Sequence, residues 1–410
     1  ITLPENSELR SIGSNAFIES SINEINIPAN VFEIGENAFS NCQNLKMVSF
    51  SENSQLQIIK KNIFSSSSVS SFSSIIEIKI SASVKKIESN AFHKCTCINT
   101  IIFAPGSQCY KFESNAFSES SIVKIKIPSS VTSIDKSAFE NCYGLHHVDF
   151  EENSKLTKIH NKAFCFSGIR NISIPKSVQK IGTQAFYSCK YLYLVVFEED
   201  SQLEKIGIES FYETAIKRIT IPSKTKKILD GAFQFTQLKK VIIPDDSELE
   251  VIGKNAFFGS FISEFPIPSN IDYLDNECFN GLENLKRIKV SPHNKHFKFD
   301  DGLLLYRESE DNKENSKDEN DANDENDDDN NENDNNNNNE NSIDNTNDNS
   351  NLNDDDKYTY LFFVGTNIDK AIIPSYVSKI NKFAFENCKE LRFIEFSKGI
   401  KMQFIDNNIL

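Results

Sequence analysis

The sequence predicts a solenoid of about fourteen stacked coils, and two regular patterns carry that prediction. Phenylalanine recurs at a near-constant interval, with successive separations of 22, 25, 28, 25, 22, 25, 22, 25, 22, 24 and 22 residues. A short apolar pattern, L-x-x-[IV]-x-[IVF], recurs between these phenylalanines. A period of roughly 20 to 30 residues is typical of one unit stacked on copies of itself, with a core shared between neighbours. The thirteen ladder phenylalanines, ten of which follow an alanine, are Phe17, Phe39, Phe64, Phe92, Phe117, Phe139, Phe164, Phe186, Phe211, Phe233, Phe257, Phe279 and Phe385.

Each apolar pattern predicts one short strand. Residues 192–197 match the pattern, which returns at 145–150, 216–221 and 285–290. Apolar spacing of three and then two places residues four and six of the pattern on the inner face of the strand. Proline, which cannot donate to a ladder, marks where pairing stops. It closes the pattern at Pro28, Pro128, Pro175, Pro222 and Pro268.

The return segment of each coil follows the form V-x-x-I-G-x-x-A-F, as in residues 178–186. It is too short for a full helix, and we expect turns or a single 3₁₀ turn along the outer side. Short and long coils alternate, at 22 and 25 residues. The long ones end in F-x-E-[ED]-[ND]-S, as in residues 150–154.

This pattern resembles the leucine-rich repeat, and more narrowly the BspA-like family. The family consensus C-x-x-L-x-x-I-x-I-P-x-x-V-x-x-I-G-x-x-A-F is matched at residues 142–164 and 189–211. The resemblance covers nearly all of the chain except residues 308–356. It implies a curved, right-handed leucine-rich-repeat solenoid of the α/β horseshoe class, with a parallel sheet on the concave face and turns or 3₁₀ segments on the convex face. It also implies a surface antigen that acts in cell adhesion.

An acidic segment, residues 308–356, interrupts the repeats. It holds 20 Asp or Glu against two Lys, a net charge of −18, whereas the whole chain carries −15; the remainder is therefore about +3. Its Asn, Asp, Glu and Ser content leaves too few apolar residues to offset ordering entropy, which predicts disorder. The flanks, 297–306 and 358–364, read as strands, so the insert is predicted at a hairpin tip. It would divide the solenoid into residues 1–307 and 357–410.

The chain begins and ends inside repeats without polar caps, which predicts a piece of a longer protein. No signal peptide and no run of 18 apolar residues is visible, so no membrane span is predicted.

Nine cysteines are predicted to be buried free thiols rather than a disulfide framework. Five of them follow a ladder phenylalanine by three residues, where related repeats carry leucine: Cys42, Cys95, Cys142, Cys189 and Cys388. Most lie two coils apart, roughly 10 Å, beyond the ~7 Å limit for a bridge. Cys95, Cys97 and Cys109 lie closer together and leave one bridge open.

Motifs for catalysis are missing from the sequence: it contains no P-loop, GxGxxG, H-E-x-x-H, G-x-S-x-G or CxxC. We therefore expect no enzymatic activity and no cofactor. His146, His147 and Asp149 form the best metal-like cluster, but adjacent strand residues point to opposite sides, so no metal site is expected. One N-glycosylation sequon, beginning at Asn171, falls within a predicted strand.

The predicted binding surface is a basic stripe on the concave face. Pattern positions two, three and five should face solvent, and of these 42 positions 14 carry Lys or Arg and six carry Asp or Glu, a net charge of about +8. The predicted ligand-binding residues are Lys124, Lys126, Arg170, Lys217, Arg218, Lys239, Lys240, Lys286, Arg287 and Lys289. These cations either solvate an open sheet or form a platform for an anionic partner, an acidic protein or a sulfated glycan. Nucleic acid is not expected, because few aromatic residues interleave with the stripe.

The sequence thus predicts a non-enzymatic binding or adhesion protein, placed at the cell surface or outside the cell by the family resemblance. Two alternatives stay open: an intracellular scaffold that uses the same face, consistent with reduced thiols, and the repeat arm of a larger enzyme whose catalytic domain lies outside this chain. The acidic insert could contact the basic stripe of its own chain and compete with anionic partners, or it could be an unselected expansion.

Overall fold

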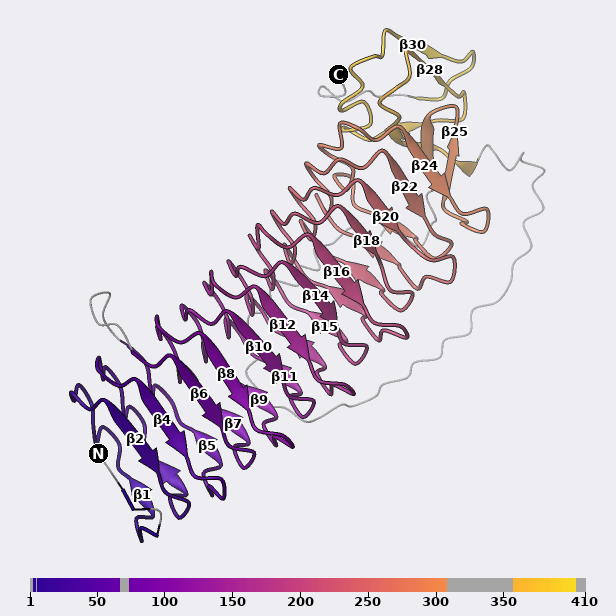
Figure 1. Ribbon diagram of the computed structural model, residues 1–410. Helices are drawn as coiled ribbons and strands as arrows, with labels where there is room; N and C mark the ends of the chain where they lie inside the picture. Colours follow the sequence, from indigo (N-terminus) through magenta and orange to yellow (C-terminus); the bar gives the residue numbers. More distant parts are fainter. Residues whose placement is uncertain (1–2, 5, 67–73, 308–356, 403–410) are drawn as a thin grey trace.

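The computed structural model describes residues 3–4, 6–66, 74–307 and 357–402, and these form a parallel β-solenoid of about fourteen coils (Figure 1). The described residues contain no α-helix. The acidic insert, with the predictions of disorder and of contact with the stripe, lies outside the described residues.

One strand of each coil has three or four residues, and these strands pair in parallel to form what we call the long-strand face. They are β2 (Glu24–Ile27), β4 (Met47–Phe50), β6 (Glu77–Ile80), β8 (Thr100–Phe103), β10 (Lys124–Ile127), β12 (His147–Phe150), β14 (Asn171–Ile174), β16 (Leu194–Phe197), β18 (Arg218–Thr220), β20 (Lys240–Ile242), β22 (Glu264–Ile267), β24 (Arg287–Val290), β28 (Lys370–Ile373) and β30 (Phe393–Phe396). The first eight form one continuous sheet, and the others pair two by two.

Alternation of side chains fixes which residues of these strands enter the core. In β10, Ile125 and Ile127 are buried, whereas Lys124 and Lys126 are exposed. The register places Ile125 opposite Val148 of β12, so inner residues stack from coil to coil. The strand ends directly before Pro128, as the sequence predicts.

A second set of strands lies in the return segments, where the sequence led us to expect only turns. Each has two residues because the V-x-x-I segment places only one apolar side chain inward before the next turn. No 3₁₀ turn occurs in the described return segments. The strands are β1 (Ser11–Ile12), β3 (Glu33–Ile34), β5 (Ile58–Ile59), β7 (Lys86–Ile87), β9 (Lys111–Phe112), β11 (Ser133–Ile134), β13 (Lys158–Ile159), β15 (Lys180–Ile181), β17 (Lys205–Ile206), β19 (Lys227–Ile228), β21 (Val251–Ile252), β23 (Tyr273–Leu274) and β29 (Lys379–Ile380).

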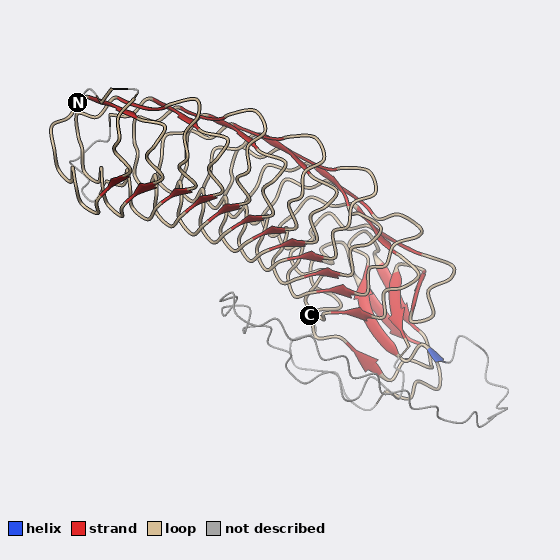
Figure 2. Cartoon of the chain, turned by 90° about the horizontal axis from the view of Figure 1, so that it is seen from below, coloured by secondary structure: helices blue, strands red, loops and turns tan. Residues whose placement is uncertain are grey.

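The solenoid is an arc, and Figure 2 shows the long strands along its outer side and the two-residue strands along its inner side. A parallel sheet does lie on the concave side, as the family resemblance implies, but the two-residue strands form it. The long strands with their basic stripe, predicted on the concave face, therefore lie on the convex, outer side instead. The long coils carry their additional residues directly after the long strand, as in 151–155 after β12. We attribute the greater width of this side to that added bulk.

The third side of each coil is a turn that carries the ladder phenylalanine. Around Phe117, the backbone passes through left-handed conformations at Asn115 (φ 58°) and Glu119 (φ 55°), which bend the chain tightly. The N–H of Phe117 donates to the carbonyl oxygen of Ala138 in the next coil at 2.8 Å. Hydrogen bonds between coils thus connect all three sides.

The predicted ladder is confirmed as a continuous stack of rings from Phe17 to Phe257, with centroids 4.9 to 5.7 Å apart. The stack ends there, because Phe265 of β22 enters the core where the other long strands from β2 to β24 carry Ile or Val. Its ring contacts Phe257 and Phe279 edge-on, at 5.1 and 5.4 Å. Phe279 is therefore outside the stack, and Phe385 belongs to a second core.

The second core begins at a four-stranded sheet of β25 (Phe297–Asp300), β26 (Leu303–Tyr306), β27 (Tyr360–Val364) and β29. The flank 297–306, predicted as one strand, is a hairpin in which β25 and β26 pair antiparallel across a turn at 301–302. The second flank contains β27, which pairs antiparallel with β26. Leu304 and Phe362 pack into the main core, whereas Leu303 and Leu361 pack into the second. Burial on both faces explains the unbroken apolar runs in these strands.

Candidate functional site

All ten predicted binding residues are exposed in the structure. Each lies on or directly before a long strand, at a position whose neighbour points into the core. They fall in the coils of β10, β14, β18, β20 and β24.

Positive charge is most concentrated at β18 and β20. Arg218 lies opposite Lys240 in the parallel register, and the N–H of Lys239 donates to the carbonyl oxygen of Lys217 at 2.9 Å. Adjacent strands are about 4.8 Å apart, so four cations share one small area. Within the described part of the chain, none of the four side chains has a salt-bridge partner. We call Lys217, Arg218, Lys239 and Lys240 the basic patch.

The stripe is weaker on both sides of the basic patch. Glu264 of β22 forms a salt bridge with Lys289 at 2.7 Å and lies opposite Arg287 in the register. Towards the N-terminus, Lys126 lies opposite Asp149. The stripe is therefore not uniform, and the basic patch is its strongest anion-attracting part.

The strand next to the basic patch is apolar on its solvent-facing side. Tyr193, Leu194 and Val196 of the β16 coil are 52%, 45% and 45% exposed, and Tyr191 just before them is 65% exposed. We call Tyr193, Leu194 and Val196 the apolar strand. Sequence reasoning weighed the charges of the stripe and its few aromatic residues, and it missed the apolar strand. The available signal was that these residues fill positions two, three and five of one pattern.

A second row of cations, also missed, runs along the two-residue strands of the inner side. The registers place Lys86 opposite Lys111, and then align four lysines of consecutive coils. We call these four, Lys158, Lys180, Lys205 and Lys227, the inner lysine row. The signal was a lysine directly before the isoleucine in four consecutive return segments.

The cysteines are free in the structure, and most of their thiols are buried. Burial raises the pKa of Cys142 to about 11 and that of Cys189 to about 12. The Sγ of Cys189 donates to the carbonyl oxygen of Phe164 at 3.1 Å and lies 3.3 Å from Ser167 Oγ. These two thiols therefore lack the lowered pKa of a nucleophilic cysteine.

The described residues hold no group of three or more His, Cys, Asp or Glu side chains suited to a metal ion. His146 Nδ1 lies 3.1 Å from the carbonyl oxygen of Gly168, while His147 and Asp149 are exposed on β12. Asn171 is half-buried in β14.

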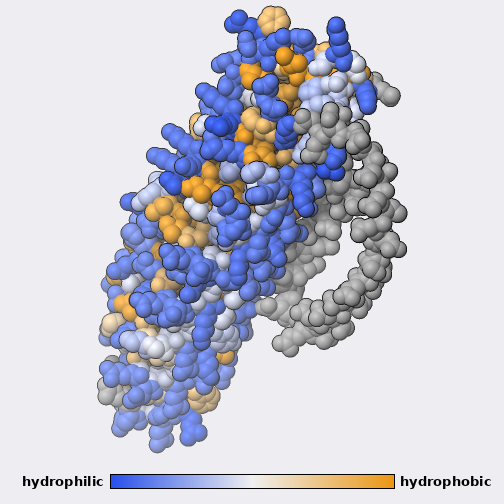
Figure 3. All heavy atoms as spheres, turned by 90° about the vertical axis from the view of Figure 1, so that its right-hand side faces the viewer, coloured by the Kyte–Doolittle hydropathy of each residue, from blue (hydrophilic) through white to orange (hydrophobic). Residues whose placement is uncertain are grey.

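Figure 3 shows a mainly hydrophilic side of the molecule with hydrophobic side chains gathered in patches along it.

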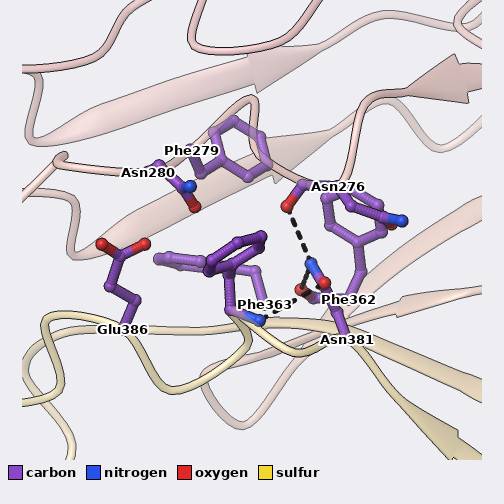
Figure 4. Close-up of a pocket in the computed structure, with 8 residues that line it drawn as sticks. Asn276, Phe279, Asn280, Phe362, Phe363, Asn381 and Glu386 are labelled. Carbon is purple, nitrogen blue, oxygen red and sulfur yellow. Dashed lines mark hydrogen bonds between the residues drawn. The ribbon is translucent and has the colours of Figure 1, made fainter. Parts of the chain in front are cut away.

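A small cleft lies where the main core meets the second core (Figure 4). Asn381 Nδ2 donates to the carbonyl oxygens of Asn276 and Phe362, at 2.9 and 3.1 Å. Burial, together with the nearby Glu277, raises the pKa of the Glu386 carboxyl beside the cleft. The aromatic lining and the Asn381 bonds identify this cleft as a junction within the fold.

Comparison with known proteins decides the family. A model of the BspA type leucine rich repeat region matches residues 1–75, 70–193, 204–300 and 357–409. The chain belongs to the BspA-type leucine-rich repeat family. No curated protein sequence matches it.

Two solved structures are among those similar to this chain. The pneumococcal vaccine antigen PcpA is 23% identical, over 66% of this chain and 72% of that one, with a TM-score of 0.42. A leucine-rich repeat protein from Bacteroides ovatus is 21% identical, over 70% of this chain and 77% of its own, with a TM-score of 0.43. Among the described residues, no helix has the length and apolar character needed to cross a membrane.

Proposed function

We propose that this chain is a non-enzymatic binding protein whose long-strand face recognises an acidic surface on a partner protein, at the cell surface. The basic patch lying directly beside the apolar strand carries this proposal. The proposed location rests on family membership.

The apolar strand favours a protein over an anionic glycan as the partner. Protein interfaces gain most of their affinity from a few aromatic, aliphatic and Arg side chains at a desolvated centre, surrounded by a polar rim. Tyr193 and Leu194 lie between Arg170 on one side and the basic patch on the other. They thus form an apolar centre with a charged rim. A sulfated glycan would use the cations and leave the apolar side chains in water.

The test compares two synthetic acidic peptides of equal length and charge, one alternating Glu with Leu or Tyr and the other alternating Glu with Ser. Calorimetric titration should show the apolar peptide binding at least about tenfold more tightly, since about 1.4 kcal/mol of apolar burial gives that factor. Replacing the apolar strand (Tyr193→Ser, Leu194→Ser and Val196→Ser) should remove this advantage and leave binding of the Glu-Ser peptide unchanged.

A matched control is Val123→Ser, which removes an exposed apolar side chain from the same face outside the apolar strand. It should leave both affinities unchanged. Equal affinity of the two peptides for the wild-type chain would contradict a protein partner. Tighter binding of a heparin oligosaccharide, abolished by Lys217→Glu with Lys240→Glu, would favour the glycan instead.

A further inference from the structure

The inner side of the solenoid contains two kinds of lysine environment. In the N-terminal coils, Lys86 forms salt bridges with Glu88 at 3.3 Å and with Glu113 of the next coil at 2.9 Å. Lys111 likewise contacts Asp135 of the next coil at 3.3 Å. In these coils, each two-residue strand is followed by a carboxylate, which lies two residues after the first residue of the strand. These carboxylates neutralise the lysines.

In the central coils the lysines persist and the carboxylates at that position do not. The position two residues after the lysine is occupied by His160, Gly182, Gly207 and Leu229. Within the described residues, Lys158, Lys180 and Lys227 have no salt-bridge partner.

Packing accounts for the two glycines, because a Cβ at Gly207 would lie 2.6 Å from the Ile181 carbonyl oxygen. It does not account for the lysines. Like charges directly opposite one another in a sheet are destabilising, so aligned lysines weaken the fold unless something anionic lies beside them.

We propose that the inner lysine row binds a linear polyanionic polysaccharide along the solenoid axis. The registers Lys158↔Lys180, Lys180↔Lys205 and Lys205↔Lys227 make the row continuous over four coils. At about 4.8 Å per coil it is roughly 14 Å long. A chain with repeated charges matches such a row, whereas a single small anion would engage only part of it.

The surroundings of the row select a polysaccharide over other polyanions. The residues that precede the lysines are Thr157, Gln179, Glu204 and Lys226; all are polar, and Glu204 is the one carboxylate among them. The apolar anchors of a protein interface are therefore missing from these four described strands. So are the aromatic stacking platforms of single-stranded nucleic-acid sites. This site is separate from the long-strand face and independent of the function proposed for it.

The experiment measures binding of the whole chain to a heparin oligosaccharide in low salt, with neutral dextran as the uncharged comparison. Lys158→Glu, Lys180→Glu and Lys227→Glu together should lower heparin affinity by more than about tenfold, because favourable charge contacts become repulsive. Binding should also fall as salt is added, since screening shortens the range of the attraction. Dextran should not bind.

A matched control makes the same charge change at exposed lysines outside both surfaces: Lys61→Glu, Lys295→Glu and Lys398→Glu. It should change heparin affinity by less than about threefold, consistent with weak long-range effects. A milder variant, His160→Glu, keeps every lysine. It places a carboxylate two residues after Lys158, as Glu88 lies two residues after Lys86, and should give an intermediate loss of heparin affinity. It also decides the matter if the triple reversal fails to fold.

Equal losses in the two triple variants would overturn the proposal, and so would unchanged heparin binding in His160→Glu. Binding of poly-Glu or single-stranded DNA as tight as that of heparin would reject the polysaccharide as the partner. Binding of the apolar acidic peptide to the long-strand face should survive the inner substitutions, so failure of either proposal can be recognised separately.

Discussion

The central coils and the C-terminal unit close their cores in different ways. In the central coils every turn contributes one ring to a single stack, as with Phe164 and Phe186, whose centroids are 5.3 Å apart and nearly parallel. In the C-terminal unit, Phe385 lies in a separate core with Leu361 and Val364. Between them stands an antiparallel pair of strands, β26 and β27, whose two faces serve the two cores.

The difference shows what regular repetition provides. A strictly repeated ring position lets each coil extend the core of the one before, so stability is shared along the stack. Once Phe265 disrupts the stacking geometry, the next coils must close the core differently. The chain does so with strands buried on both sides, and its second core is smaller.

The largest expected effect is the loss of a central ring. Phe186→Ala should lower the free energy of unfolding by about 3–5 kcal/mol, because a fully buried ring leaves a cavity between two stacked neighbours. Phe385→Ala, at a ring 7% exposed in the second core, should cost less. Urea unfolding followed by circular dichroism measures both, and wild-type stability of Phe186→Ala would show that the assigned coil register is incorrect.

An intermediate effect is expected at the junction of the two cores. Asn381→Ala leaves the carbonyl oxygens of Asn276 and Phe362 without this donor and should cost about 1–3 kcal/mol. Hydrogen exchange should show faster opening of β27 and β29 and unchanged protection of β10 to β16. Ser378→Ala, which removes only a 3.4 Å contact to Thr359, is the matched control. Uniform loss of protection along the whole chain would show that the two cores unfold as one.

The smallest effect at neutral pH concerns the thiols. Cys189 is fully buried with its pKa raised to about 12, whereas Cys388 of the C-terminal unit is half-buried with its pKa raised to about 11. Alkylation of the native protein near pH 8 should modify Cys388 well before Cys189, as peptide mass spectrometry can show. Equal rates would contradict the proposed difference in packing.

The same thiols should make stability depend on pH in the alkaline range. Because burial raises both pKa values above the ordinary value of 9.0, the contribution of the thiols to stability is complete below pH 9. It is lost as the pH rises from about 9 towards 11 or 12, so the melting temperature should fall over that range. In Cys388→Ala the melting temperature should fall less over this pH range than in the wild-type chain. An equal fall in the two proteins would show that other groups cause the effect.

Much of the fold follows from the sequence alone, because its determinants are local. The spacing of the ladder phenylalanines predicts the coil length, and the alternation in segments such as 192–197 predicts the buried face of each strand. Both predictions are confirmed by the stacked rings and by the burial of Val195. Exposure of the ten stripe residues follows from the same apolar pattern, which leaves positions two, three and five facing solvent.

Tertiary structure decides what depends on neighbouring coils. Which side of the arc is the outer one depends on the relative bulk of the sides, and no single repeat contains that information. The interruption of the stack at Phe265 depends on where its ring meets Phe257 and Phe279. The inner lysine row exists only because residues 22 and 25 apart in the chain, such as Lys158, Lys180 and Lys205, come into register. The place of each lysine within its coil is a property of the sequence, and the stacking of coils makes them a row.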